Sequence, residues 1–91
     1  MKTIYKYPIK VDDDQTIRMP QGAELLSVQC QASQPCVWAM VDTDKPMALR
    51  GFGLVGTGHP CERLHAGKYV GTFQMRDGTL VFHLFDFGEA L

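Results

Sequence analysis

Two runs of alternating residues, 68–75 (KYVGTFQM) and 79–87 (TLVFHLFDF), stand on either side of the tripeptide RDG at residues 76–78. Asp-Gly between two runs of alternating residues is the strongest short-range signal for a β-hairpin. The stretch therefore predicts two antiparallel strands joined by a tight turn.

The second of these runs is apolar on both faces of the expected strand. Phe82 and Leu84 share one face, and the other carries Val81, His83, Phe85 and Phe87. A chain this small has few layers with which to cover two apolar faces. We therefore expect a subunit interface to cover one of them, and hence a homo-oligomer, a dimer or larger.

Five more segments have strand-like composition and are separated by turn residues. They are residues 3–9, 16–19, 23–31, 36–42 and 48–55. Residues 36–42 are apolar on both faces, which predicts a strand covered on both sides. Gly51 and Gly53 share one face of the fifth segment, where glycine indicates a bend, a bulge or a close backbone approach.

One short helix of about two turns is expected at residues 61–66. Pro60 fits the first helical position, Glu62 the acidic first turn and Gly67 the C-terminal stop. The predicted fold class is mainly β, in a single domain covering residues 1–91. It is a small barrel or a two-layer sandwich of six or seven strands, with the helix before a C-terminal hairpin.

Composition excludes several classes of protein. The 91 residues are 45% hydrophobic and 21% charged, which is typical of a globular domain and excludes a disordered chain. Nine basic and ten acidic residues give a net charge of −1, so general nucleic-acid binding is not expected. The longest apolar run, residues 36–41, is far too short to span a membrane, and residues 1–8 lack the apolar core of a signal peptide. We expect a cytoplasmic protein that makes no membrane contact.

Three cysteines, Cys30, Cys36 and Cys61, are expected to be free and buried, because an odd number in a reducing compartment argues against disulfides. A zinc site using Cys61, His65 and the other cysteines is the alternative. It lacks the closely spaced ligand pair that structural zinc usually has. We expect no metal and no cofactor.

The segment Gly56-Thr57-Gly58-His59-Pro60 is the candidate ligand-binding loop. Two glycines allow backbone amides to approach a ligand, and the expected helix N-terminus would favour an anion such as phosphate. The candidate ligand-binding residues are Arg50, Gly56, Thr57, Gly58, His59, Lys68 and His83. The competing interpretation is a plain strand-to-helix turn, with surface cations and a satisfied core histidine.

The sequence predicts no catalytic residues. Cys61 and His59 are neighbours, but sequence proximity does not create a nucleophile with an oriented base. The run Asp12-Asp13-Asp14 is typical of a solvated turn rather than a pair of catalytic carboxylates. An enzyme is therefore less expected than a binding protein.

Several short motifs resemble, in the same order, a family of small proteins of unknown function common in bacteriophage and prophage genomes. They are IYKYPI (4–9), MPQGA (19–23), LSVQ (26–29), GTGHP (56–60), YVGT (69–72) and FHLF (82–85). The resemblance implies a phage setting and the host cytoplasm, and it assigns no catalytic residues.

The hypothesis drawn from these observations is a non-enzymatic binding protein. It would sequester a small anionic, nucleotide-like ligand such as a host defence signal. Two alternatives stay open. One is a protein-interaction module that inhibits a host protein through an apolar surface near the final strand. The other is a small nucleotide hydrolase.

Overall fold

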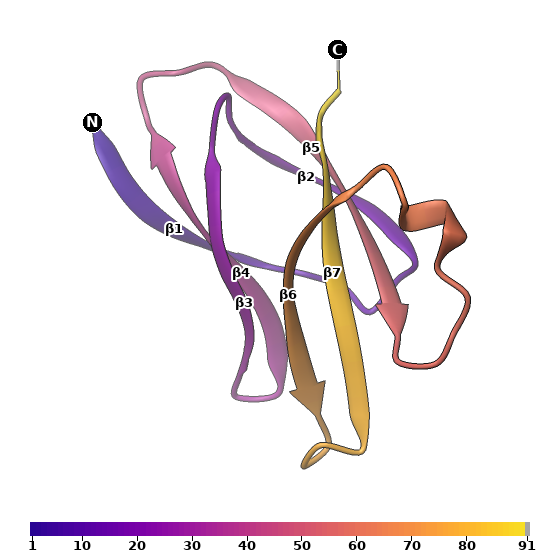
Figure 1. Ribbon diagram of the computed structural model, residues 1–91. Coiled ribbons are helices and arrows are strands. Elements are labelled where there is room, and N and C mark those ends of the chain that lie inside the picture. Colours follow the sequence, from indigo (N-terminus) through magenta and orange to yellow (C-terminus); the bar gives the residue numbers. More distant parts are fainter. Residues whose placement is uncertain (91) are drawn as a thin grey trace.

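The computed structural model describes residues 1–90 as seven strands in two antiparallel sheets (Figure 1). The strands are β1 (Lys2–Pro8), β2 (Asp14–Pro20), β3 (Glu24–Gln31), β4 (Gln34–Asp42), β5 (Met47–Gly56), β6 (Lys68–Met75) and β7 (Leu80–Glu89). One sheet has the order β1-β4-β3, and the other has the order β2-β5-β7-β6. The mainly β fold class with seven strands is confirmed.

The two sheets pack face to face and enclose one hydrophobic core. Its fully buried members come from both sheets and include Met19, Val37, Phe52 and Leu84. At one side of the sandwich β3 lies against β6, where a Cβ on Gly71 would stand 2.9 Å from a Val28 methyl carbon. Within residues 1–90 these two strands are not hydrogen-bonded neighbours, so the structure is a two-layer sandwich and not a closed barrel.

Strand β4 is fully covered on one face and, beyond the buried Cys36, only partly covered on the other, which corrects the expectation of cover on both. Val37, Ala39 and Val41 point into the core and are at most 1% exposed. On the other face Trp38 is half-buried and Met40 is 38% exposed. The reason is architectural, because the three-stranded sheet has no further layer on its outer side.

The C-terminal hairpin is confirmed, and its turn explains the Asp-Gly signal. Met75 pairs with Leu80, and Arg76, Asp77 and Gly78 all have positive φ, at 52°, 55° and 88°. Left-handed backbone of this kind is cheap for glycine and tolerable for aspartate. The turn therefore depends on local sequence, which is why it is readable without a structure.

The expected helix of two turns is shorter than predicted. The structure has a single turn of 3-10 helix, η1 (Glu62–Leu64). Its one buried side chain is Leu64, which is seated on Gly53 of β5 beside Phe87 of β7. The glycine face of β5 thus allows Leu64 and Phe87 to pack closely against the strand. A close approach was one of the three interpretations of these glycines. The η1 segment supplies part of the cover for the outer face of β7.

Within residues 1–90, no helix has the length and apolar character needed to cross a lipid bilayer.

Candidate functional site

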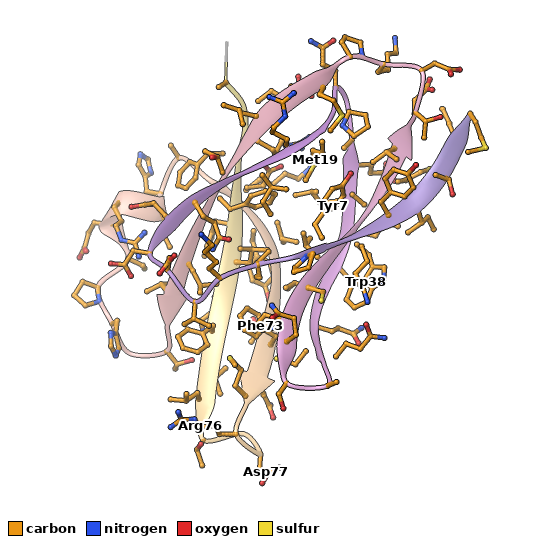
Figure 2. All side chains as sticks on the ribbon, turned by 180° about the vertical axis from the view of Figure 1, so that it is seen from behind. Tyr7, Met19, Trp38, Phe73, Arg76 and Asp77 are labelled. Atoms are coloured by element: carbon orange, nitrogen blue, oxygen red, sulfur yellow. The ribbon has the colours of Figure 1, made fainter. Side chains whose placement is uncertain are left out.

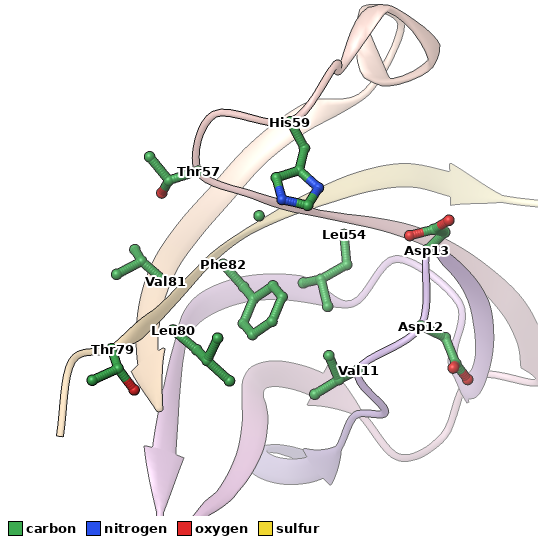
Figure 3. Close-up of a pocket in the computed structure, with 11 residues that line it drawn as sticks. Val11, Asp12, Asp13, Leu54, Thr57, His59, Thr79, Leu80, Val81 and Phe82 are labelled. Atoms are coloured by element: carbon green, nitrogen blue, oxygen red, sulfur yellow. The ribbon is translucent and has the colours of Figure 1, made fainter. Parts of the chain in front are cut away.

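A cavity of about 420 Å³ lies beside the GTGHP loop, and we call it the loop pocket (Figure 3). Three parts of the chain enclose it: the connection between β1 and β2, the end of β5 with the loop that follows, and the start of β7. The lining residues are Val11, Asp12, Asp13, Leu54, Gly56, Thr57, His59, Thr79, Leu80, Val81 and Phe82. The volume falls within the range of small-molecule sites.

Backbone hydrogen bonds hold the loop against the two strands that flank it. The Thr57 N–H donates to the Val81 carbonyl at 3.1 Å, and the His59 N–H donates to the Gly56 carbonyl at 3.1 Å. Between them Gly58 has φ +86°, a conformation that side chains disfavour. The loop needs one glycine for its geometry, as the plain-turn interpretation expected, and it also forms a wall of a cavity.

The walls of the loop pocket are largely apolar. Leu54 and Phe82 reach it from the core, while Val11 and Leu80 stand at its mouth and are 48% and 38% exposed. In Figure 3 the His59 ring turns toward Leu54, whereas the Thr57 side chain points away. An apolar body with one polar contact at His59 is the kind of ligand that such walls accept.

The charge at the rim of this pocket is negative. Asp12 and Asp13 line it, and Asp14 follows at the start of β2. Arg63 stands 3.7 Å from an Asp13 carboxylate oxygen and 3.5 Å from one of Asp14, and it also donates to the Leu54 carbonyl. Asp13 and Asp14 therefore face one guanidinium, and with Asp12 the three carboxylates outnumber it, so the local field favours a cation.

Arg50 and Lys68, two of the predicted ligand-binding residues, lie elsewhere. They line a second cavity of about 310 Å³, together with Asp86 and Glu24. The Arg50 guanidinium donates to both Asp86 carboxylate oxygens, at 3.0 and 2.8 Å, and to the Ala23 carbonyl at 2.8 Å. The Arg50 guanidinium thus binds groups of its own chain rather than a ligand.

The Arg50–Asp86 pair is largely buried, with side chains 13% and 9% exposed. The hydrogen bond to Asp86 raises the pKa of Arg50. Burial acts to raise the pKa of Asp86, but the hydrogen bonds from Arg50 and from the Gly88 N–H hold that pKa below its usual value. Both groups therefore stay charged at neutral pH.

His83, another predicted site residue, forms a hydrogen-bonded chain on the outer face of β7. Its Nε2 lies 2.7 Å from the Thr57 hydroxyl, and its Nδ1 lies 2.8 Å from the Thr72 hydroxyl. Thr72 in turn lies 2.6 Å from the Tyr69 hydroxyl. The structure thus brings His83 to Thr57, as expected for one site, but on the side away from the apolar walls. Both ring nitrogens already have partners.

The three cysteines are free, and their environments differ. Cys36 is buried, Cys30 is half-buried and Cys61 is exposed, so the expectation of burial is wrong for Cys61. Burial raises the pKa of the Cys30 thiol. Among residues 1–90, no group of three or more His, Cys, Asp or Glu side chains is placed to hold a metal ion.

Comparison with known proteins decides the family. A family model described as "Domain of unknown function (DUF7352)" matches residues 1–90. The chain belongs to this family. No curated protein and no solved structure matches it.

Sequence reasoning found one half of the loop pocket and missed the other. It identified Gly56, Thr57 and His59 but not the opposite wall, which Val11, Asp12, Asp13 and Leu80 form in this DUF7352 domain. The carboxylates were recognised only as a turn. Asp12 and Asp13 are held at the pocket because the Leu54 N–H donates to the Asp13 carbonyl at 2.9 Å. These residues are far apart in sequence, so no local sequence pattern predicts this contact.

Proposed function

We propose that the protein is a non-enzymatic binding protein that takes a small ligand into the loop pocket. One observation carries the proposal: a cavity of about 420 Å³ combines apolar walls with an excess of carboxylates at its rim. The ligand that fits has an apolar body and a cationic group, such as an aliphatic or aromatic amine. The apolar part would contact Leu54, Leu80 and Phe82, and the cation would lie toward Asp12 and Asp13.

The geometry favours this ligand over the nucleotide-like anion suggested by the loop alone. A phosphate in the loop pocket would lie near the negative charges of Asp12 and Asp13, which repel it. The cations that were to attract it, Arg50 and Lys68, line the other cavity. A 3-10 helix of one turn also adds no appreciable dipole field.

The hydrogen-bonded chain at His83 supports binding rather than catalysis. It ends at the Tyr69 hydroxyl, with no carboxylate joined to it within residues 1–90. A histidine that serves as a base for a hydroxyl nucleophile is normally oriented by a carboxylate, which also stabilises the imidazolium. We assign the chain a structural role, because it ties Thr57 of the loop to β6 and β7.

The proposal includes a biological setting. The ordered likeness of short motifs along nearly the whole chain supports a phage or prophage protein that acts in the host cytoplasm. The free thiols are in keeping with a reducing compartment. In that setting the ligand would be a small host metabolite or signal carrying an amine.

A matched pair of probes tests the proposed ligand class. Hexylamine and hexanoate share an apolar body and differ in the sign of charge. We expect hexylamine to raise the melting temperature of the full chain in a dose-dependent way, and hexanoate and cyclic or linear nucleotides to leave it unchanged. Stabilisation by the anions without stabilisation by the amine would contradict the proposal, as would no response to any probe.

Two variants locate the effect. Asp12 has no hydrogen bond or ion pair within residues 1–90, so Asp12→Asn removes a charge without removing a contact. It should weaken hexylamine binding a few-fold, about 2- to 5-fold for one partly screened charge. Glu24→Gln makes the same change of charge at the second cavity and should leave hexylamine binding unaltered.

A further inference from the structure

Strand β2 has an open edge whose hydrogen-bonding groups are unused. In its pairing with β5, the residues that bond across to β5 are the odd-numbered ones, as the Leu54 N–H to Asp13 and Gln21 N–H to Pro46 bonds show at the two ends. The N–H and C=O groups of Asp14, Thr16 and Arg18 therefore point away from the sheet. All three residues are exposed, and β1 in the other sheet does not cover this edge.

The side chains along this edge are complementary to themselves. Asp14 and Arg18 are four residues apart, with Thr16 midway. In an antiparallel pair of two copies of β2 centred on Thr16, Asp14 of each copy faces Arg18 of the other. Arg18 makes no ion pair or side-chain hydrogen bond within residues 1–90, whereas Asp14 stands 3.5 Å from Arg63. Registers centred on Asp14 or on Arg18 would place like charges opposite each other, which destabilises a pair of strands.

Exposed apolar side chains flank the same edge on the outer face of the sheet. Arg18 pairs with Leu49, which is 43% exposed, and Thr16 pairs with Gly51, over which Phe87 lies at 40% exposed. Two β2 strands would then lie between one β5 and the other, which would be about 14 Å apart, so these apolar side chains of the two copies would not meet. The proposed interface depends on backbone hydrogen bonds and on the pairing of charges.

Of the remaining edge strands, β3 and β6 lie against each other, and β1 has a character opposite to that of β2. The Thr43 N–H to Met1 and Ile9 N–H to Pro35 bonds mark the odd-numbered residues as those bonded to β4, so Lys2, Ile4 and Lys6 present the free groups. Lysines on an edge strand discourage pairing with another strand. A self-pair centred on Ile4 would also set Lys2 against Lys6.

We propose that the protein forms a two-fold symmetric dimer in which the β2 strands of two copies pair antiparallel about Thr16, joining the two four-stranded sheets. Each of the facing pairs Asp14–Arg18, Thr16–Thr16 and Arg18–Asp14 exchanges two backbone hydrogen bonds. The interface is isologous, as dimers of this kind require. The second copy, and not a strand of another protein, is the occupant because the charge pattern is complementary to itself.

A cysteine placed on the symmetry axis tests the register. In full-length protein carrying Cys61→Ser, Thr16→Cys should form a disulfide-linked dimer on mild oxidation, because residues facing in a hydrogen-bonded pair lie about 5.5 Å apart at Cα, within disulfide range. Arg18→Cys in the same background is the matched control. Its two copies would lie roughly 13 Å apart along the strand and should not cross-link.

Charge exchange tests the complementarity by sedimentation equilibrium. Arg18→Asp and Asp14→Arg should each weaken the dimer roughly tenfold or more, since each sets two like-charged pairs opposite. The double variant should restore the wild-type dissociation constant, while Arg76→Asp, in the β6–β7 turn at the opposite edge of the sheet, should not change it. A wild-type chain that is monomeric throughout would overturn the proposal. So would a dimer that the double variant fails to restore, or one that cross-links through Arg18→Cys but not through Thr16→Cys.

Discussion

Arg50 and Asp86 form a largely buried, two-point ion pair, and Arg50 also donates to the Ala23 carbonyl. The pair ties β5 to β7 and to the start of β3. An arginine that satisfies one carboxylate and one carbonyl of its own fold has a structural role.

Replacing Asp86 by Asn should therefore cost stability rather than binding. The change leaves the Arg50 guanidinium largely buried without its counter-charge, which typically costs about 3 kcal/mol or more of the free energy of unfolding. Urea denaturation at neutral pH measures this. The folded Asp86→Asn protein should still bind hexylamine. A loss of well under 1 kcal/mol in the free energy of unfolding would contradict the structural role of the pair.

The pH dependence of stability follows from the same residue. The pKa of Asp86 is lower in the folded state than in the unfolded chain, so the unfolded chain takes up the proton first as pH falls. Its contribution is complete above the ordinary aspartate value of about 4 and is lost as pH falls through the lowered folded value. The wild-type protein should lose stability over this acid range, and Asp86→Asn should lose less. If the free energy of unfolding fell equally steeply with pH in both proteins, the stabilising role of ionised Asp86 would be contradicted.

Two glycines on one face of β5 offer a matched comparison. A Cβ on Gly53 would lie 2.8 Å from a Phe87 ring carbon and closer still to Leu64, whereas a Cβ on Gly51 would make an ordinary contact at 3.6 Å. Gly53→Ala should cost about 1–3 kcal/mol of stability through overpacking. Gly51→Ala should be close to neutral, and thermal unfolding of both compares them. Equal effects would contradict the close approach.

Among the elements of the fold, η1 covers part of the outer face of the four-stranded sheet. Its single buried side chain, Leu64, is 2% exposed and sits on Gly53. Leu64→Ala should cost about 3 kcal/mol, in the range for truncating a buried leucine. It should also speed amide exchange in η1 and at the end of β5. The exposed neighbour substitution His65→Ala is the control, and a Leu64→Ala protein as stable as that control would contradict the role.

The same element shows where sequence reasoning stops. Pro60, Glu62 and Gly67 were local signals for a helix, and a single helical turn does form there. Its length, however, is set by tertiary packing, because only Leu64 finds a place in the core. The Asp77-Gly78 turn was predictable because its left-handed backbone is a property of those residues themselves.

The candidate site was half predictable for a related reason. The GTGHP loop is local and was identified. Arg50 and Gly56 lie six residues apart on one extended strand, roughly 20 Å at about 3.3 Å per residue, so nearness in sequence placed them too close. Asp12 and Asp13 reach the pocket through pairing of β2 with β5, which brings together residues some forty positions apart.

At the scale of the whole molecule, the sandwich separates two kinds of surface. The loop pocket opens at one end, where the connections gather, and the edge of β2 runs along a side (Figure 2 shows the molecule from behind, with Met19 of β2 labelled). A ligand in the pocket and a second copy on the edge would thus use different residues. Ligand affinity and dimerisation should consequently respond to different substitutions, with Asp12→Asn leaving the dimer intact and Arg18→Asp leaving hexylamine binding intact.

A titration followed by methyl resonances in heteronuclear NMR tests directly whether the loop pocket binds an amine. Hexylamine and hexanoate are added in turn to the wild-type protein, and the methyl groups of Val11, Leu54 and Leu80 report on the loop pocket. We expect saturable shifts of these methyl resonances with hexylamine, smaller shifts in Asp12→Asn, and none with hexanoate. Shifts confined to other parts of the molecule, or produced by hexanoate instead, would contradict the proposal.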